Sequence, residues 1–290
     1  MVVLFFARFS FQTLVCGKMT DKFIDLDKVF KTKNPKLYKW LPRFILNYVK
    51  RIVHQEEIND FMVLHGKDNA FEFCHAVIKK FNVKAVVNGL ENIPQNGGVI
   101  LAANHPLGGF DGMTMVTLIG ERRKDVSFIV NDLLLNIQPL QEIFTGVNKH
   151  GKNASESLQN INALFASDRA LFVFPAGMVS RRINGKVTDL KWQKTFVTRA
   201  RKHNKPIIPI HVDGHLSNWF YNLSNGRKKL GIKANIEMLY LSDEMFKQQD
   251  RTITFNIGKP IMPDTFTGKG NDQHWADEVR KEVYRLGGEK

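Results

Sequence analysis

The stretch ILAANHPLGGFDGM, residues 100–113, begins with an apolar run and turns into a loop that carries a histidine and an aspartate. The apolar run is typical of a buried strand. In the loop, Gly108 and Gly109 lie between His105 and Asp111. A neutral imidazole is an effective general base once a carboxylate fixes its tautomer through the other ring nitrogen. If the glycines let the loop fold back, Asp111 can orient His105 as a catalytic base.

The same residues have a second interpretation. Asp111 shortly precedes the apolar run MTMVTLIG and is a good N-cap for a helix. His105 and Asp111 would then only stabilise a strand-to-helix turn, which Asn104 can brace through bonds to the backbone. In the catalytic interpretation, the N–H groups of Gly108 and Gly109 can bind a developing oxyanion. The spacing alone leaves both interpretations open.

Short apolar runs alternate with helical segments from residue 83 onward. The runs are VKAVVNG (83–89), GVILAAN (98–104), DVSFIV (125–130), ALFVFPAG (170–177), PIIPIHVDG (206–214) and TITFNIGKPI (252–261). Helices are predicted near residues 111–123, 153–167, 193–204 and 274–286, the second with a capping box formed by Asn153 and Glu156. This alternation predicts an α/β domain over residues 83–290, with a mostly parallel or mixed central sheet flanked by helices. Its active groups should follow the carboxyl ends of strands, where His105 lies.

An N-terminal helical extension is predicted over residues 19–82, preceded by a leader or an upstream start over residues 1–18. Between residues 28 and 51 there is no acid, and the basic residues are Lys28, Lys31, Lys33, Lys36, Lys39, Arg43, Lys50 and Arg51. After Pro42, one apolar stripe is expected from Phe44, Ile45, Tyr48, Val49, Ile52 and Val53. Either this helix packs on its own domain with a solvated basic face, or it lies on an anionic membrane with Tyr38 and Trp40 at headgroup level.

The net charge of +14 over 290 residues favours anionic partners: nucleic acid, an acidic membrane face, or a polyanionic substrate or carrier. The two cysteines, Cys16 and Cys74, form no disulfide framework or metal spacing, which favours a reducing, cytoplasmic setting. No apolar run of the sequence has the length of a membrane span.

The sequence contains no G-x-S-x-G elbow, and neither cysteine has a histidine–carboxylate context. A His–Asp pair without a protein nucleophile indicates direct attack by an activated hydroxyl or water. In HVDGH, the residues His211, Asp213 and His215 could converge on a metal, although the DG pair favours a turn at the end of the strand. Asn184–Gly185 predicts a hairpin, and the run 219–221 (Trp-Phe-Tyr) is either core or a rim that dips into lipid.

The segment NHPLGGFDG (104–112) resembles the first sequence block of the glycerolipid, or lysophospholipid, acyltransferase family (PlsC-like), whose signature is NH, four residues and D. Here five residues separate His105 from Asp111, as in the similar hemolysin-like branch, which includes bacterial enzymes of ornithine-lipid and glycine-lipid synthesis. Further blocks follow in the family's order: GVNKHGKN (146–153), VFPAGMVSRR (173–182), KPIIPIHVDG (205–214) and FNIGKPI (255–261). The resemblance covers roughly residues 83–262.

The resemblance implies transfer of a fatty acyl group from a thioester of acyl carrier protein or coenzyme A, used as a co-substrate, to the hydroxyl of a lysolipid. His105 would remove the hydroxyl proton, and Asp111 would orient His105. The residues that the resemblance assigns to substrate binding are Asn104, Gly108, Gly109, Lys149, Gly177, Ser180 and Arg181. No bound cofactor is implied. Ala176 replaces the glutamate usual in the third block, which makes glycine or ornithine lipids better candidates as acceptors than lysophosphatidic acid.

The resemblance also implies a peripheral protein on the cytoplasmic side of the inner membrane, with no nucleic-acid partner. Two other functions fit parts of the sequence. A hydrolase would use the His–Asp pair to activate water against the thioester. A basic nucleic-acid-binding protein would account for the charge, but no helix-turn-helix, zinc finger or aromatic RNA-binding signature is present in the sequence.

Overall fold

The computed structural model describes residues 22–131, 134–147, 154–267 and 270–288. Within these ranges the core is a seven-stranded sheet in the order β1-β9-β8-β2-β5-β3-β4. The strands are β1 (Lys84–Asn88), β2 (Val99–Ala103), β3 (Val126–Asn131), β4 (Phe144–Val147), β5 (Ala170–Val173), β8 (Ile207–Asp213) and β9 (Thr252–Ile257). All neighbours pair in parallel except β8 and β9, which pair antiparallel. The predicted α/β class with a mostly parallel, mixed sheet is confirmed.

Helices cover both faces of the sheet, and alternate residues of each central strand face opposite layers. In β2, Val99, Leu101 and Ala103 pack in the core beneath α6 (Ala70–Lys80) and α7 (Gly109–Gly120). Ile100 and Ala102 pack on the other face with α9 (Thr195–His203) and α12 (Asp272–Leu286). Both faces of β2 are therefore apolar, as a strand in the middle of a sheet requires.

The observed elements follow most of the predicted ones. The helix expected over 153–167 is α8 (Ala154–Ala166), and Asn153 of its predicted capping box lies outside the described residues. The Asn184–Gly185 hairpin is confirmed: it joins β6 (Arg181–Ile183) to β7 (Lys186–Thr188), and both turn residues have a positive φ, +49° and +81°. Strand β4 and the helices α10 (Asn218–Lys229) and α11 (Leu241–Phe246) had no counterpart in the prediction.

The N-terminal helices form a separate apolar cluster. They are α2 (Leu26–Lys33), α3 (Pro35–Trp40), α4 (Arg43–Ile52) and α5 (Gln55–His65). In α4 the buried stripe consists of Leu46, Val49 and Ile52, whereas Phe44 is 73% exposed. The expected stripe is therefore right for Val49, Ile52 and Val53, which are buried, and wrong for Phe44 and Tyr48, which are exposed because the buried face of α4 is turned toward Leu46. Helix α6 packs on α7 and belongs to the cover of the sheet.

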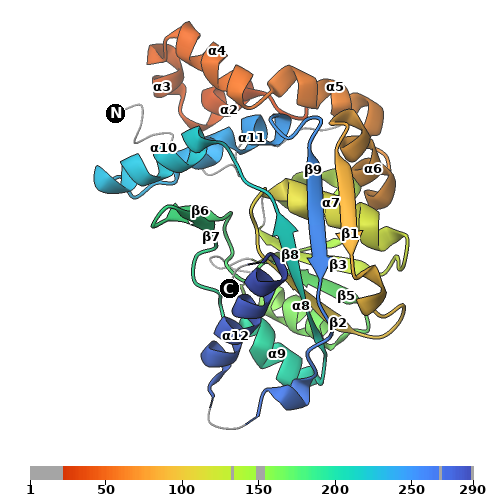
Figure 1. The fold of residues 1–290 in the computed structure, drawn as a ribbon. Coiled ribbons are helices and arrows are strands. Elements are labelled where there is room, and N and C mark those ends of the chain that lie inside the picture. The colour runs from red at the N-terminus through yellow and green to blue at the C-terminus, as the bar shows by residue number, and fades with distance from the viewer. Residues whose placement is uncertain (1–21, 132–133, 148–153, 268–269, 289–290) are drawn as a thin grey trace.

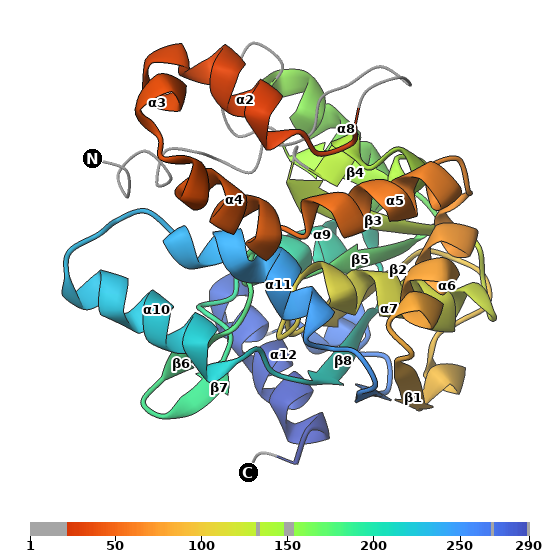
Figure 2. The same cartoon turned by 90° about the horizontal axis from the view of Figure 1, so that it is seen from above.

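The N-terminal cluster lies over the sheet edge toward which the arrow of β8 points, beside α10 and α11 (Figures 1 and 2). His54 connects the cluster to α11, because its Nε2 lies 3.2 Å from Asp243 and its ring stacks on Phe246. The hydroxyls of Tyr48 and Tyr240 form a second connection at 2.8 Å. Among the described residues, no helix is both long and apolar enough to cross a bilayer.

Candidate active site

Strand β2 ends at Ala103, and the next residue holds the chain to strand β8 by its side chain. The Asn104 amide donates to the Val212 carbonyl at 2.9 Å and accepts from the Val212 N–H at 2.7 Å. This pair of bonds substitutes for ladder bonds at the point where the backbone leaves the sheet. Asn104 is only 4% exposed, so its amide braces the turn, as one of the expectations from the sequence had it.

His105 and Asp111 face one another across the loop. The His105 Nδ1 lies 2.9 Å from an Asp111 carboxylate oxygen, and the Leu107 N–H donates to the same carboxylate at 3.0 Å. Asp111 is fully buried, and burial raises its pKa above the usual range, against the opposing effects of the bonds from His105 and Leu107. The His105 side chain remains 16% exposed. The arrangement holds Nδ1 and leaves Nε2 without a partner among the described residues.

The alternative role of Asp111 as an N-cap is wrong. Gly108 occupies the N-cap position of α7, with φ +69°, and Asp111 lies inside the first turn. A side chain at Gly108 would be strained at this φ. Gly109 is exposed, and a Cβ built on it meets no atom within 4 Å. The amino end of α7, with its partial positive charge, therefore opens beside the His–Asp pair.

The segment after β5 packs directly on His105. The Phe174 ring stacks on the imidazole with centroids 4.0 Å apart and planes at 24°. Gly177 is exposed, has φ +65°, and has open space where a Cβ would lie. The Ser180 N–H donates to the His105 carbonyl at 2.8 Å. Residues of the first and third sequence blocks are thus in contact.

Two residues of the third block do not fit the expected contact with an acceptor head group. Ser180 is fully buried, and its hydroxyl donates to Asp189. Arg181 is 1% exposed and pairs with the buried Glu237, whose other oxygen accepts from Arg227. Burial also lowers the pKa of Arg181. A buried hydroxyl or charge must keep its partner inside the protein, so neither side chain is free to bind an acceptor head group.

Sequence reasoning missed Phe174 and Asp189, which both contact His105. The signal for Asp189 was present: it is the single acid between Ala176 and Lys205. Lys149 lies outside the described residues. The metal interpretation of His211, Asp213 and His215 is wrong, because no group of three or more His, Cys, Asp and Glu side chains in the described ranges could hold a metal.

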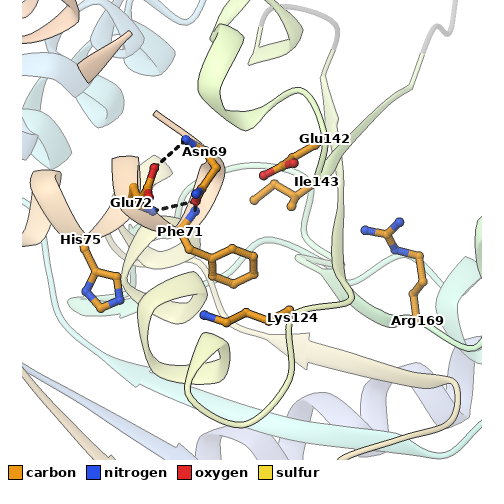
Figure 3. Close-up of a pocket in the computed structure, with 8 residues that line it drawn as sticks. All are labelled: Asn69, Phe71, Glu72, His75, Lys124, Glu142, Ile143 and Arg169. Carbon is orange, nitrogen blue, oxygen red and sulfur yellow. Dashed lines mark hydrogen bonds between the residues drawn. The ribbon is translucent and has the colours of Figure 1, made fainter. Parts of the chain in front are cut away.

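A cavity of about 710 Å³ lies elsewhere in the molecule (Figure 3). It is lined by Asn69, Phe71, Glu72, His75, Lys124, Glu142, Ile143 and Arg169. Lys124 and Arg169 precede β3 and β5, whereas His105 follows β2. The cavity is therefore at the amino edge of the parallel strands, opposite the His–Asp pair.

The chain is similar to known acyltransferases. The profile of a family described as "Acyltransferase" matches residues 28–289. A "Lyso-glycine lipid O-acyltransferase" of Phocaeicola vulgatus is 42% identical over 276 residues, or 94% of this chain and 99% of that protein. A protein of the same name from Bacteroides thetaiotaomicron is 42% identical over 272 residues, covering 92% of this chain and all of that protein (100%).

A solved structure shares the fold. The crystal structure of the 1-acyl-sn-glycerophosphate (LPA) acyltransferase PlsC from Thermotoga maritima superposes with a TM-score of 0.50 at 19% identity, covering 85% of this chain and 90% of that one. The family profile and the two relatives span nearly the whole chain. This chain therefore belongs to the acyltransferase family and is an acyltransferase enzyme.

Proposed function

We propose that the enzyme transfers a fatty acyl group from a thioester, on acyl carrier protein or coenzyme A, to the hydroxyl of a lysolipid. The acceptor class that we propose is a lyso-amino-acid lipid such as lyso-glycine lipid, the acceptor in the names of the two relatives. The observation that carries the proposal is the buried Asp111 carboxylate on the His105 Nδ1, an arrangement that leaves the other ring nitrogen available to a substrate.

In the proposed reaction, the acceptor hydroxyl donates to the His105 Nε2. As the hydroxyl oxygen bonds to the thioester carbonyl carbon, its proton moves to Nε2, and Asp111 stabilises the imidazolium. The amino end of α7, at Gly109, supplies partial positive charge for the oxyanion. The tetrahedral intermediate then breaks its C–S bond, and the leaving thiolate takes the proton from Nε2. The new ester and a free thiol are the products.

Acceptor choice follows from the third block. Ala176 and the exposed Gly177 leave no acidic side chain at the position where the resembling family has glutamate. We therefore favour an amino-acid lipid as the acceptor. Lysophosphatidic acid remains the competing acceptor in the test below.

The test is an assay of the purified full chain with acyl carrier protein and coenzyme A thioesters against lyso-glycine, lyso-ornithine and lysophosphatidic acid acceptors. Product masses identify the donor and acceptor together. Ester formation with an amino-acid lipid supports the proposal. Release of free fatty acid at the same rate without any lysolipid would instead support the thioesterase alternative.

Phe174→Leu should lower kcat by about 2- to 10-fold, because it removes the ring stacked on His105; such aromatic contacts contribute about 0.5–1.5 kcal/mol. Steady-state kinetics with the best donor and acceptor measure the effect. The matched control is Phe71→Leu, at the cavity on the opposite edge of the sheet. Equal losses in both variants would mean that the stacking has no specific role.

We further propose that the enzyme docks peripherally on the cytoplasmic face of the inner membrane through α3 and α4. Trp40 is 85% and Phe44 73% exposed, and Lys36, Lys39 and Arg43 around them are exposed as well. Exposed aromatic side chains within a basic segment suit the boundary between headgroups and acyl chains of an anionic bilayer.

The double substitution Trp40→Ala and Phe44→Ala should lower partitioning onto anionic vesicles by about 10-fold or more, because burial of one large apolar side chain contributes about 1.5–3 kcal/mol.

Replacing Lys33, Lys36, Lys39 and Arg43 by Gln should also weaken binding, by about 1 kcal/mol for each charge near the surface. Sedimentation with vesicles of phosphatidylglycerol and phosphatidylethanolamine measures both.

The control for the membrane experiment is Met262→Ala. Met262 is 51% exposed and follows β9, whose arrow points away from α3 and α4 (Figure 1). Partitioning that is unchanged in the Trp40 and Phe44 variant, or reduced equally in the Met262 variant, would refute docking through this surface.

A further inference from the structure

Asp189 is a buried acid that the proposed reaction leaves without a role. It directly follows β7 and is only 2% exposed. It is the single acidic residue in the basic segment of the sequence from Ala176 to Lys205. A buried carboxylate needs several donors to offset the loss of water. The groups that donate hydrogen bonds to the Asp189 carboxylate therefore indicate its role.

The Asp189 carboxylate accepts three hydrogen bonds from three parts of the chain. Oδ1 accepts from the His105 N–H at 3.2 Å and from the Ser180 hydroxyl. Oδ2 accepts from the Trp192 indole N–H at 2.9 Å. The Ser180 N–H in turn donates to the His105 carbonyl at 2.8 Å. Both polar backbone groups of His105 are thus held by Asp189 or by its partner Ser180.

His105 needs this support because of where it lies. Strand β2 ends at Ala103, so the backbone of His105 is past the last ladder bond of the strand. A buried N–H without an acceptor would cost free energy, and a carboxylate is among the strongest acceptors available. With its N–H, its C=O and its Nδ1 all bonded, His105 has a fixed backbone and a fixed ring, and Nε2 alone is left to act.

Asp189 is itself anchored. Its N–H donates to the Tyr284 hydroxyl oxygen at 2.7 Å, and its carbonyl accepts from Arg280 at 3.3 Å, both on α12. Trp192, which donates to Oδ2, is fully buried in the core beneath α9 and α12. The Asp189 carboxylate is therefore anchored to the packed core. A group that fixes the position of another group needs such an anchor.

We infer that Asp189 is a positioning residue: through the His105 N–H and Ser180 it fixes the direction in which His105 presents Nε2 to the acceptor hydroxyl. This inference rests on the proposed function for its kinetic consequence. Asp189 does not touch substrate, since it is buried behind the loop. Its removal should therefore lower kcat and leave KM nearly unchanged, because small misplacements of a catalytic group cost up to about 100-fold in rate.

The kinetic test compares two substitutions. Asp189→Leu removes the acceptor and should lower kcat about 10- to 100-fold with KM within about 3-fold. Asp189→Asn keeps an oxygen for the His105 N–H and the Ser180 hydroxyl but turns its NH₂ group toward the Trp192 N–H, so it should retain more of kcat than Asp189→Leu does. Equal losses in the two variants, or a normal kcat in Asp189→Leu, would overturn the inference.

Glu244→Gln is the matched control. Glu244 is also fully buried, and it also accepts from a backbone N–H and a serine hydroxyl, both of Ser217, but it has no contact with His105. This control should lose thermal stability and keep its kcat when assayed well below its Tm. A loss of kcat that follows the loss of Tm in all three variants would show a merely structural role for Asp189.

An NMR measurement tests the same inference without any acyl transfer. In protein labelled with ¹⁵N-histidine, His105 should give one sharp Nδ1–H signal, and Asp189→Leu should broaden or split it while Glu244→Gln leaves it unchanged. If Asp189→Leu does not fold, the His105 backbone amide proton is followed in Asp189→Asn. It should move upfield as a neutral acceptor replaces a charged one, and an unchanged resonance would contradict the inference. Lack of activity on every lysolipid would refute the proposed function and leave this result intact.

Discussion

Replacing His105 by alanine is expected to lower kcat by about 10²- to 10⁴-fold, the usual contribution of a positioned general base. The loss should fall on kcat, because the variant lacks the group that removes the hydroxyl proton while the surfaces that bind donor and acceptor remain. His105 is only partly exposed and its neighbours Asn104 and Ser180 hold the loop through their own bonds. Steady-state kinetics with a thioester donor and a lysolipid acceptor measure the effect.

The control for this experiment is His75→Ala. His75 is an exposed histidine of α6 beside the cavity at the opposite sheet edge. It should retain the activity of the unmodified enzyme. If His105→Ala transferred acyl groups within a few-fold of the unmodified rate, another group would have to be the base.

Asp111→Asn is expected to reduce kcat by about 10²-fold or more. An asparagine must use its oxygen for the Leu107 N–H and would then present its NH₂ group to the His105 Nδ1. Facing a donor, Nδ1 becomes the acceptor, and the ring proton moves to Nε2. The nitrogen that should take the hydroxyl proton is then already protonated, so the imidazole is held in the wrong tautomer.

Asp111→Asn is expected to preserve or raise the thermal stability at neutral pH, although it lowers kcat. Burial raises the pKa of Asp111, so the native state binds a proton at this carboxyl more tightly than the unfolded chain does. The contribution of Asp111 to stability is therefore complete below the unfolded pKa, about 3.9, and is lost as the pH rises through the raised native value. Asp111→Asn has no such loss and should match or exceed the unmodified Tm at neutral pH.

Thermal unfolding of both proteins between pH 4 and pH 8 tests this second expectation. The unmodified enzyme should lose stability relative to Asp111→Asn as the pH rises. A large fall in Tm for Asp111→Asn, parallel to its loss of turnover, would return Asp111 to a purely structural role.

The sequence predicted the strands that lie in the middle of the sheet and the position of the His–Asp pair. β2 and β5 are apolar on both faces and are therefore recognisable as continuous runs. Strand β4 was missed because it is a short strand at the edge of the sheet, FTGV, with a glycine and few β-branched residues. The cap of α7 was misassigned because Gly108, which has no side chain to bond to the helix, occupies the cap position.

Much of the site could not be predicted, because it depends on contacts between distant segments. The sequence around Arg181 does not indicate that its guanidinium pairs with Glu237, which is distant in the chain. The same holds for the contacts of Ser180 and Asp189 with His105, which bring the two ends of the hairpin β6–β7 to a loop far away in the sequence. Phe44 shows the converse: its spacing matched a buried stripe, and the packing of α4 decided otherwise.

The antiparallel pairing of β8 and β9 has a consequence for how the catalytic loop is built. Because β9 runs antiparallel to β8, the chain leaves β9 at the edge of the sheet opposite His105, and α12 runs back along the sheet (Figure 1). The last turn of α12 therefore lies near the edge of the sheet that carries His105, and the Tyr284 hydroxyl accepts a hydrogen bond from the Asp189 N–H there. The direction of β9 thereby lets the final helix support a histidine that lies far upstream in the sequence.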